Sequence, residues 1–165
     1  MKKNIVLSIL LIHISFYVSD LFPQEEIKIE NNVKLEYTQT ESRDVPKLGD
    51  EKGSRIILYF DGRIEKYSIV YGSGEILLAV RKLNQNEFNF IDRIFSEYNF
   101  LEYPDKIPMI KTPMWPSSST GVKYKACQEC ELKAFSTSSN SDRRNIPSNY
   151  YEFIHELKAR LYSYF

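Results

Sequence analysis

Cys127 and Cys130 are the only two cysteines of the chain, and they are separated by two residues. A thiol–disulfide exchange pair with this spacing usually begins a helix, whose dipole lowers the thiol pKa. Here the flanking residues alternate as in strands, and Glu129 and Glu131 would raise that pKa. A zinc site needs four ligands, and the chain has no second cysteine pair. We favour a structural disulfide across a tight turn, with the redox pair as the alternative.

A second group of candidate residues lies in the proline-rich connection 100–119. It contains Met109, Ile110, Met114 and Trp115, the only tryptophan. Soft and aromatic side chains on a stiff loop are suited to contact a ligand or a partner protein. The interpretation that we favour for this segment is that it folds back to cover a face of a sheet.

Few other residues are suited to catalysis. His155 is the only histidine beyond the N-terminal segment, and a surface position is favoured over a role as general base in a hydrolase. The sequence contains no nucleophile-elbow, metalloprotease or phosphate-loop motif, and its carboxylates form no defensible acid–base pair. We therefore expect no metal, no cofactor and a non-enzymatic role.

The charges of the chain nearly balance. It has 165 residues, with 22 Lys and Arg against 22 Asp and Glu. A protein that binds nucleic acid electrostatically needs a basic stripe, so a nucleic-acid partner is not expected.

The N-terminus has the pattern of an export signal. Two lysines precede an apolar run at residues 5–18, which is shorter than the ~20 residues that span a bilayer. We interpret residues 1–19 as a signal peptide, with an uncleaved anchor as the alternative. Residues 20–32 form a polar lead-in and residues 33–165 a single domain. The expected location is extracytoplasmic, with membrane contact only through an uncleaved N-terminal segment.

The sequence of the first half of the domain predicts an antiparallel meander. Residues 55–67 form its central hairpin, in which Asp61-Gly62 favours a type I′ turn with positive φ at both residues. Apolar and polar residues alternate over 33–38, which predicts a first strand with one face exposed to solvent. The continuous apolar run 75–80 predicts a strand buried on both faces. Residues 41–54 are expected to form an exposed loop.

Two helices and a second hairpin complete the predicted fold. Asn84 and Glu87 form a capping box before a helix that runs to about Asn99. A hairpin spans residues 121–134 and a polar loop covers 136–145. Ser148 or Asn149 is expected to cap a last helix. The sequence thus predicts an α+β fold, with an antiparallel sheet of five to six strands and two helices packed on one face.

Several segments resemble a family of small exported bacterial domains of uncharacterised function. The similar residues are Ile-Leu-Tyr-Phe-Asp-Gly-Arg at 57–63 with Tyr67, the helix at 84–98 with Phe100-Leu101, and the terminal hairpin and helix. Together they cover about residues 33–165. The resemblance implies export and a sheet with two helices, and it implies no activity. We expect an exported domain with a binding or structural role at the cell envelope, whose partner is a protein or a small ligand.

Overall fold

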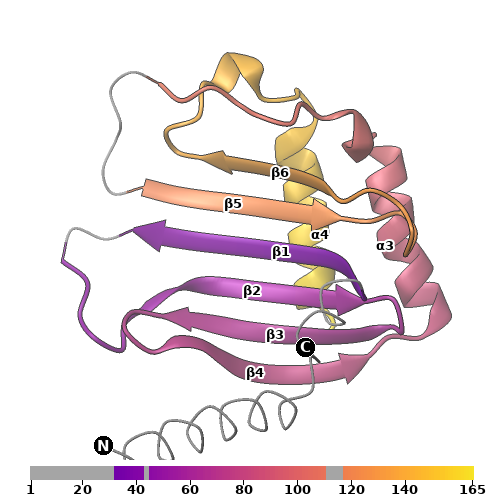
Figure 1. Cartoon of the computed structure of the whole chain (residues 1–165), viewed down its shortest axis with the longest axis horizontal. Helices are drawn as coiled ribbons and strands as arrows, with labels where there is room; N and C mark the ends of the chain where they lie inside the picture. Colours follow the sequence, from indigo (N-terminus) through magenta and orange to yellow (C-terminus); the bar gives the residue numbers. More distant parts are fainter. Residues whose placement is uncertain (1–31, 43–44, 111–116) are drawn as a thin grey trace, which may run out of the picture. The chain divides into compact units, whose positions relative to one another are not determined.

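The computed structural model describes residues 32–42, 45–110 and 117–165. In this part of the chain six antiparallel strands form one sheet, and two α-helices cover one of its faces (Figure 1). The strands are β1 (Val33–Ser42), β2 (Glu51–Tyr59), β3 (Arg63–Val70), β4 (Gly74–Lys82), β5 (Ser117–Tyr124) and β6 (Lys133–Ser138). The helices are α3 (Gln85–Glu97) and α4 (Tyr150–Tyr162), with short 3-10 turns η1 (Phe100–Glu102) and η2 (Arg143–Asn145). The predicted fold class is confirmed.

The strand order β4-β3-β2-β1-β5-β6 places the first strand near the middle of the sheet. Three consecutive hairpins join β1 to β4, as the sequence predicts, and β5 then pairs with the other side of β1. β4 and β6 are therefore the two edges. Residues Asn32–Phe165 form one compact unit, and within the described residues neither helix has the length and apolarity needed to cross a bilayer. The expected signal segment, 1–19, and the lead-in before residue 32 lie outside the described residues.

The turn between β2 and β3 differs from the predicted type I′ turn. Gly62 has a φ of 85°, but Asp61 is not in the positive-φ region. The Gly62 N–H donates to the Tyr59 carbonyl at 3.0 Å, and Asp61 Oδ1 accepts from the Arg63 N–H at 2.9 Å. These bonds are typical of a type I turn followed by a glycine bulge. The Asp-Gly pair still reverses the chain, with the aspartate acting through its side chain.

The hydrophobic core lies between the sheet and the two helices. Alternate strand residues point into it, which follows from the period of two along a strand. Phe95 of α3 stacks on Tyr124 of β5 with ring centroids 3.8 Å apart, which fixes α3 against the sheet. The fully buried core residues include Leu35, Tyr37, Ile56, Leu58, Ile64, Ile91, Ile94, Phe100, Phe153, Leu157 and Leu161.

The helix starts are only partly as predicted. Asn84 caps α3, and its side chain and that of Glu87 form the expected reciprocal capping box. Asn149 precedes α4, but its side chain does not cap that helix. Instead it donates to the Tyr98 carbonyl and accepts from the Tyr103 hydroxyl, both at 3.0 Å. Asn149 therefore ties the end of α3 to the start of α4.

Two segments predicted as loops are partly strand. β1 continues to Ser42 and β2 begins at Glu51, so the expected loop 41–54 is shorter than predicted. Likewise β6 runs to Ser138 inside the expected loop 136–145. Polar residues continue these strands because neighbouring strands hydrogen-bond to their backbone groups. The composition of a segment does not show that such a neighbour is present.

The prediction that residues 75–80 are buried on both faces is wrong. They belong to β4, an edge strand, in which Ile76, Leu77, Leu78 and Val80 are 46–56% exposed. A short apolar run does not distinguish a central strand from an edge strand, because that position depends on the order of all the strands.

Candidate functional site

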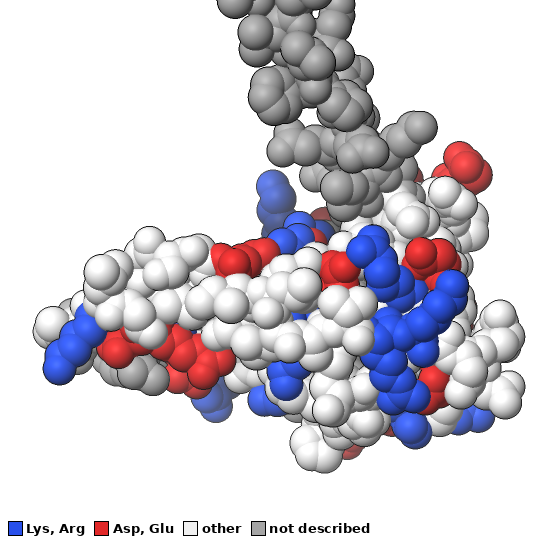
Figure 2. All heavy atoms as spheres, turned by 90° about the horizontal axis from the view of Figure 1, so that it is seen from below, with Lys and Arg blue, Asp and Glu red and all other residues white. Residues whose placement is uncertain are grey.

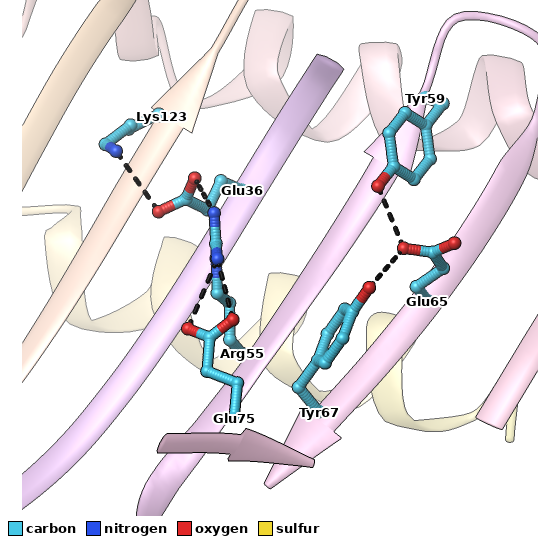
Figure 3. Close-up of polar contacts among 7 residues, drawn as sticks. All are labelled: Glu36, Arg55, Tyr59, Glu65, Tyr67, Glu75 and Lys123. Atoms are coloured by element: carbon cyan, nitrogen blue, oxygen red, sulfur yellow. Dashed lines mark hydrogen bonds and ion pairs between the residues drawn. The ribbon is translucent and has the colours of Figure 1, made fainter. Parts of the chain in front are cut away.

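The face of the sheet opposite the helices carries two networks of charged side chains and phenol hydroxyls. We call it the open face, because neither described helix packs on it (Figure 1). Its residues alternate along each strand with those of the core, so their placement follows directly from the strand register. The open-face residues that make the polar contacts below are Glu36, Arg55, Tyr59, Glu65, Tyr67, Glu75 and Lys123, shown in Figure 3.

A chain of ion pairs crosses the open face from β5 to β4. Lys123 Nζ lies 3.2 Å from Glu36, Arg55 Nη2 lies 2.8 Å from the other oxygen of Glu36, and Arg55 Nη1 lies 2.9 Å from Glu75 (Figure 3). Burial acts to raise the pKa of Glu36, but the hydrogen bond and charge of Arg55, with Lys123, outweigh it and lower that pKa. Burial likewise acts to lower the pKa of Arg55, and its two carboxylate partners raise it. Glu36 and Arg55 are therefore both charged at neutral pH.

A second network surrounds Glu65, whose side chain is only 8% exposed. The hydroxyls of Tyr59 and Tyr67 donate to Glu65 Oε2 at 2.8 and 2.6 Å, and Arg63 Nη1 lies 2.6 Å from Oε1 (Figure 3). Burial and the bond to Glu65 raise the pKa of Tyr59, and the same causes raise that of Tyr67 to about 12. Both phenols stay protonated and donate their hydrogen to Glu65, so the network suits a rigid support better than acid–base catalysis.

Beside these networks, a groove of about 550 Å³ opens where β1, β5 and β6 run together. Thr38, Gly121 and Ser136 lie opposite one another on these strands and share the open face. Gly121 has no side chain, so it leaves room between its neighbours. Hydroxyl groups dominate the strand side of the groove, and the segment 105–109 forms its other side. The residues that line it include Thr38, Ser119, Gly121, Ser136, Ser138, Asp105 and Met109.

The structure places part of the predicted contact loop at this groove. Met109 forms a bridge with Ser141 and lines the groove with 62% of its surface exposed. The Ile110 N–H donates to the Asn140 carbonyl at 2.8 Å, so the segment runs beside the end of β6. The Met109 side chain is exposed, whereas Ile107 of the same segment packs against the core, so the covering role of the whole segment stays a prediction. Met114 and Trp115 lie outside the described residues.

Cys127 and Cys130 form a disulfide in the turn between β5 and β6, with their Cα atoms 5.0 Å apart. The Cys130 N–H donates to the Cys127 carbonyl at 3.1 Å, which closes the tight turn predicted for this position. The pair lies in a hairpin and not at a helix N-terminus, so no helix dipole lowers the thiol pKa.

His155 is exposed on α4, as the favoured interpretation predicted. Its neighbour Glu156 accepts a hydrogen bond from the Tyr98 hydroxyl at 3.0 Å. Within the residues that the structure describes, no group of three or more histidine, cysteine or acidic side chains is placed to hold a metal ion.

Sequence reasoning missed Lys34, which is 2% exposed. Its ammonium lies 2.7 Å from Asp92 of α3 and 4.9 Å from the centre of the Phe88 ring, and it donates to the Ala126 carbonyl at 3.3 Å. A register shift between Val33 and Leu35 accompanies this placement. In the sequence, Lys34 occupies a polar position of an alternating strand, so the pattern does not indicate that its side chain is buried.

A scan against protein-family models finds no family that matches this chain, and a search of curated proteins finds no match either. The resemblance to exported bacterial domains therefore stays a prediction.

Proposed function

We propose that this chain is an extracytoplasmic, non-enzymatic domain that binds a polar ligand on the open face of its sheet. The observation that carries the proposal is the hydroxyl-lined groove between β1, β5, β6 and the segment 105–109. The apolar run near the N-terminus and the disulfide between Cys127 and Cys130 support the location, since disulfides persist outside the cytosol.

The chemistry of the groove favours a neutral ligand that bears hydroxyl or amide groups. Threonine and serine hydroxyls both donate and accept hydrogen bonds, so they match such groups without burying a charge. The ion pairs of Glu36 with Arg55 and Lys123 lie next to the groove and hold β1, β2 and β5 in register. Because these strands are held rigidly, the groove keeps one shape, which lowers the entropic cost of binding a ligand.

Site-specific photo-crosslinking in the source cells tests this role while the ligand is still unidentified. A benzophenone amino acid at Ser136, inside the groove, should form adducts that are detected as added mass. The matched control carries the same group at Ser96, which is exposed on α3 and does not line the groove. We expect adducts at position 136 and none of the same mass at position 96.

Gly121→Val provides the second arm of this test. A Cβ at Gly121 meets only the Cβ of Ser136, at 3.9 Å, which is an ordinary contact, so a side chain can be added there. Valine favours a strand and would occupy part of the groove. Adduct formation at Ser136 should fall at least about tenfold, which corresponds to about 1.4 kcal/mol of binding. Adducts that persist in Gly121→Val, or that form equally from Ser96, would show that the groove is not the binding site.

The exposed disulfide supports a second candidate function, thiol–disulfide exchange through Cys127 and Cys130. We expect the structural role instead. Replacing both cysteines by alanine should lower the free energy of unfolding by at most about 2 kcal/mol, because so short a loop removes little entropy from the unfolded chain. Urea titrations of the two proteins measure this difference.

The reduced protein should also fail to reduce insulin, and its thiol pKa should be about 8.5, the value of a free cysteine, or higher. Catalytic insulin reduction together with a thiol pKa well below that value would establish the exchange function and reject the structural one.

A further inference from the structure

The edge strand β4 presents an apolar surface to solvent. Ile76, Leu77, Leu78 and Val80 are each about half exposed, at 46–56%. Figure 2 looks onto this side of the molecule and shows an uncharged band, which is bordered by acidic side chains and, towards the right, by a cluster of basic ones. β3 pairs with one side of β4, and no other strand among the described residues pairs with its other side, where the backbone groups can accept a further strand.

Natural edge strands are usually protected by charged residues within them. β4 has no charged residue from Ile76 to Val80; its charges are Glu75 at one end and Arg81 and Lys82 at the other. An antiparallel partner with the same sequence would place each acidic end against a basic end. A parallel copy would place like charges together. This charge pattern selects a second copy of the same strand, in antiparallel orientation.

A bulge in β4 determines which residues share a face. Leu77 pairs with Tyr67 and Val80 pairs with Glu65, and both of these β3 residues lie on the open face. The register shift between these pairs adds Leu78 to the opposite face, where it lines a hollow together with Lys66 and Tyr162. The open-face residues of β4 are therefore Glu75, Leu77, Val80 and Lys82, and the other face carries Ile76, Leu78, Ala79 and Arg81.

We propose that β4 pairs with β4 of a second copy of this chain, antiparallel, around a two-fold axis between Leu78 and Ala79. In this register every residue faces a partner residue on the same side of the sheet. Glu75 lies opposite the partner's Lys82, and Leu77 lies opposite the partner's Val80. A register shifted by one residue would place open-face side chains against residues of the other face.

The resulting dimer joins two six-stranded sheets into one continuous sheet of twelve strands. Because the interface is symmetric, each β4 covers the other and no β4 edge remains free. The groove described above lies at β1, β5 and β6, away from this edge, so the dimer does not depend on the proposed ligand.

Sedimentation velocity of the chain without residues 1–19, over a range of concentrations, tests the dimer. The unmodified chain should sediment as a dimer, and Leu77→Lys should raise the dissociation constant at least about tenfold, because it buries a charge opposite the partner's Val80. Leu132→Lys is the matched control, since Leu132 is also 50% exposed but lies in the turn between β5 and β6. The control should dimerise like the unmodified chain.

A charge exchange tests the register. Lys82→Glu should weaken the dimer because it places two carboxylates opposite each other, and adding Glu75→Lys should restore it. Circular dichroism checks that each variant stays folded, since Glu75 also contacts Arg55. An unmodified chain that is monomeric at all concentrations, or a dimer that Leu77→Lys leaves intact, rejects the proposal. A double variant as weak as Lys82→Glu rejects the register.

Discussion

Replacing Lys34 by alanine is expected to lower the free energy of unfolding by about 3 kcal/mol. Lys34 is nearly fully buried, and it links β1 to Asp92 of α3 and to the Ala126 carbonyl before the β5–β6 turn. Its loss removes the ion pair, the hydrogen bond and the contact of its ammonium with the face of the Phe88 ring. Urea titration followed by circular dichroism measures the change.

Two further variants separate the charge from the packing. Lys34→Met keeps most of the buried stem and should recover a large part of the lost stability, because Asp92 is 38% exposed and keeps contact with water. Asp92→Asn leaves the ammonium of Lys34 buried without its counter-charge, so it should cost at least as much as Lys34→Met. If Lys34→Ala costs less than about 1 kcal/mol, the buried link between sheet and helix is not a significant source of stability.

Glu65→Ala is the second change with a large expected effect, also about 3 kcal/mol. The hydroxyl of Tyr59, a residue only 4% exposed, would lose its acceptor, and Tyr67 and Arg63 would lose theirs. Glu65→Gln keeps an acceptor oxygen for the two phenols and should cost clearly less. Equal losses in the two variants would show that side-chain volume, and not hydrogen bonding, determines the effect.

The change in stability at alkaline pH tests the same network, because the direction of that change follows from the raised pKa values. The pKa of Tyr67 is raised to about 12, above its ordinary value of 10.0, and that of Tyr59 is raised as well. A raised pKa contributes stability that is complete below pH 10.0 and is lost as pH rises towards the folded-state pKa. The free energy of unfolding should therefore fall above about pH 10, and it should fall less steeply in Tyr67→Phe. An identical pH profile for this variant would exclude Tyr67 as a source of the effect.

Much of the fold can be predicted from local pattern. The alternation of residues 33–38, the reversal at Asp61-Gly62 and the capping box of Asn84 each indicate an element that the structure contains. These signals depend on neighbouring residues and backbone preferences, so a single sequence reveals them.

The features that depend on strand order could not be predicted. The run at 75–80 has the composition of a central strand, yet β4 is an edge. The groove arises because Gly121 and Ser136 meet Thr38, a residue from a strand far earlier in the chain. Lys34 is buried through contacts with α3 and the β5–β6 turn, which no local pattern specifies.

The proposed role depends first on where the chain functions, and the intact mass of the protein isolated from its own cells tests this directly. We predict that the protein is recovered from an extracytoplasmic fraction without residues 1–19. Its mass should be lower by two hydrogen atoms than the mass of the same processed chain after reduction, because Cys127 and Cys130 are joined. A full-length chain with both thiols reduced, recovered from the cytosol, would contradict the account of an exported binding domain.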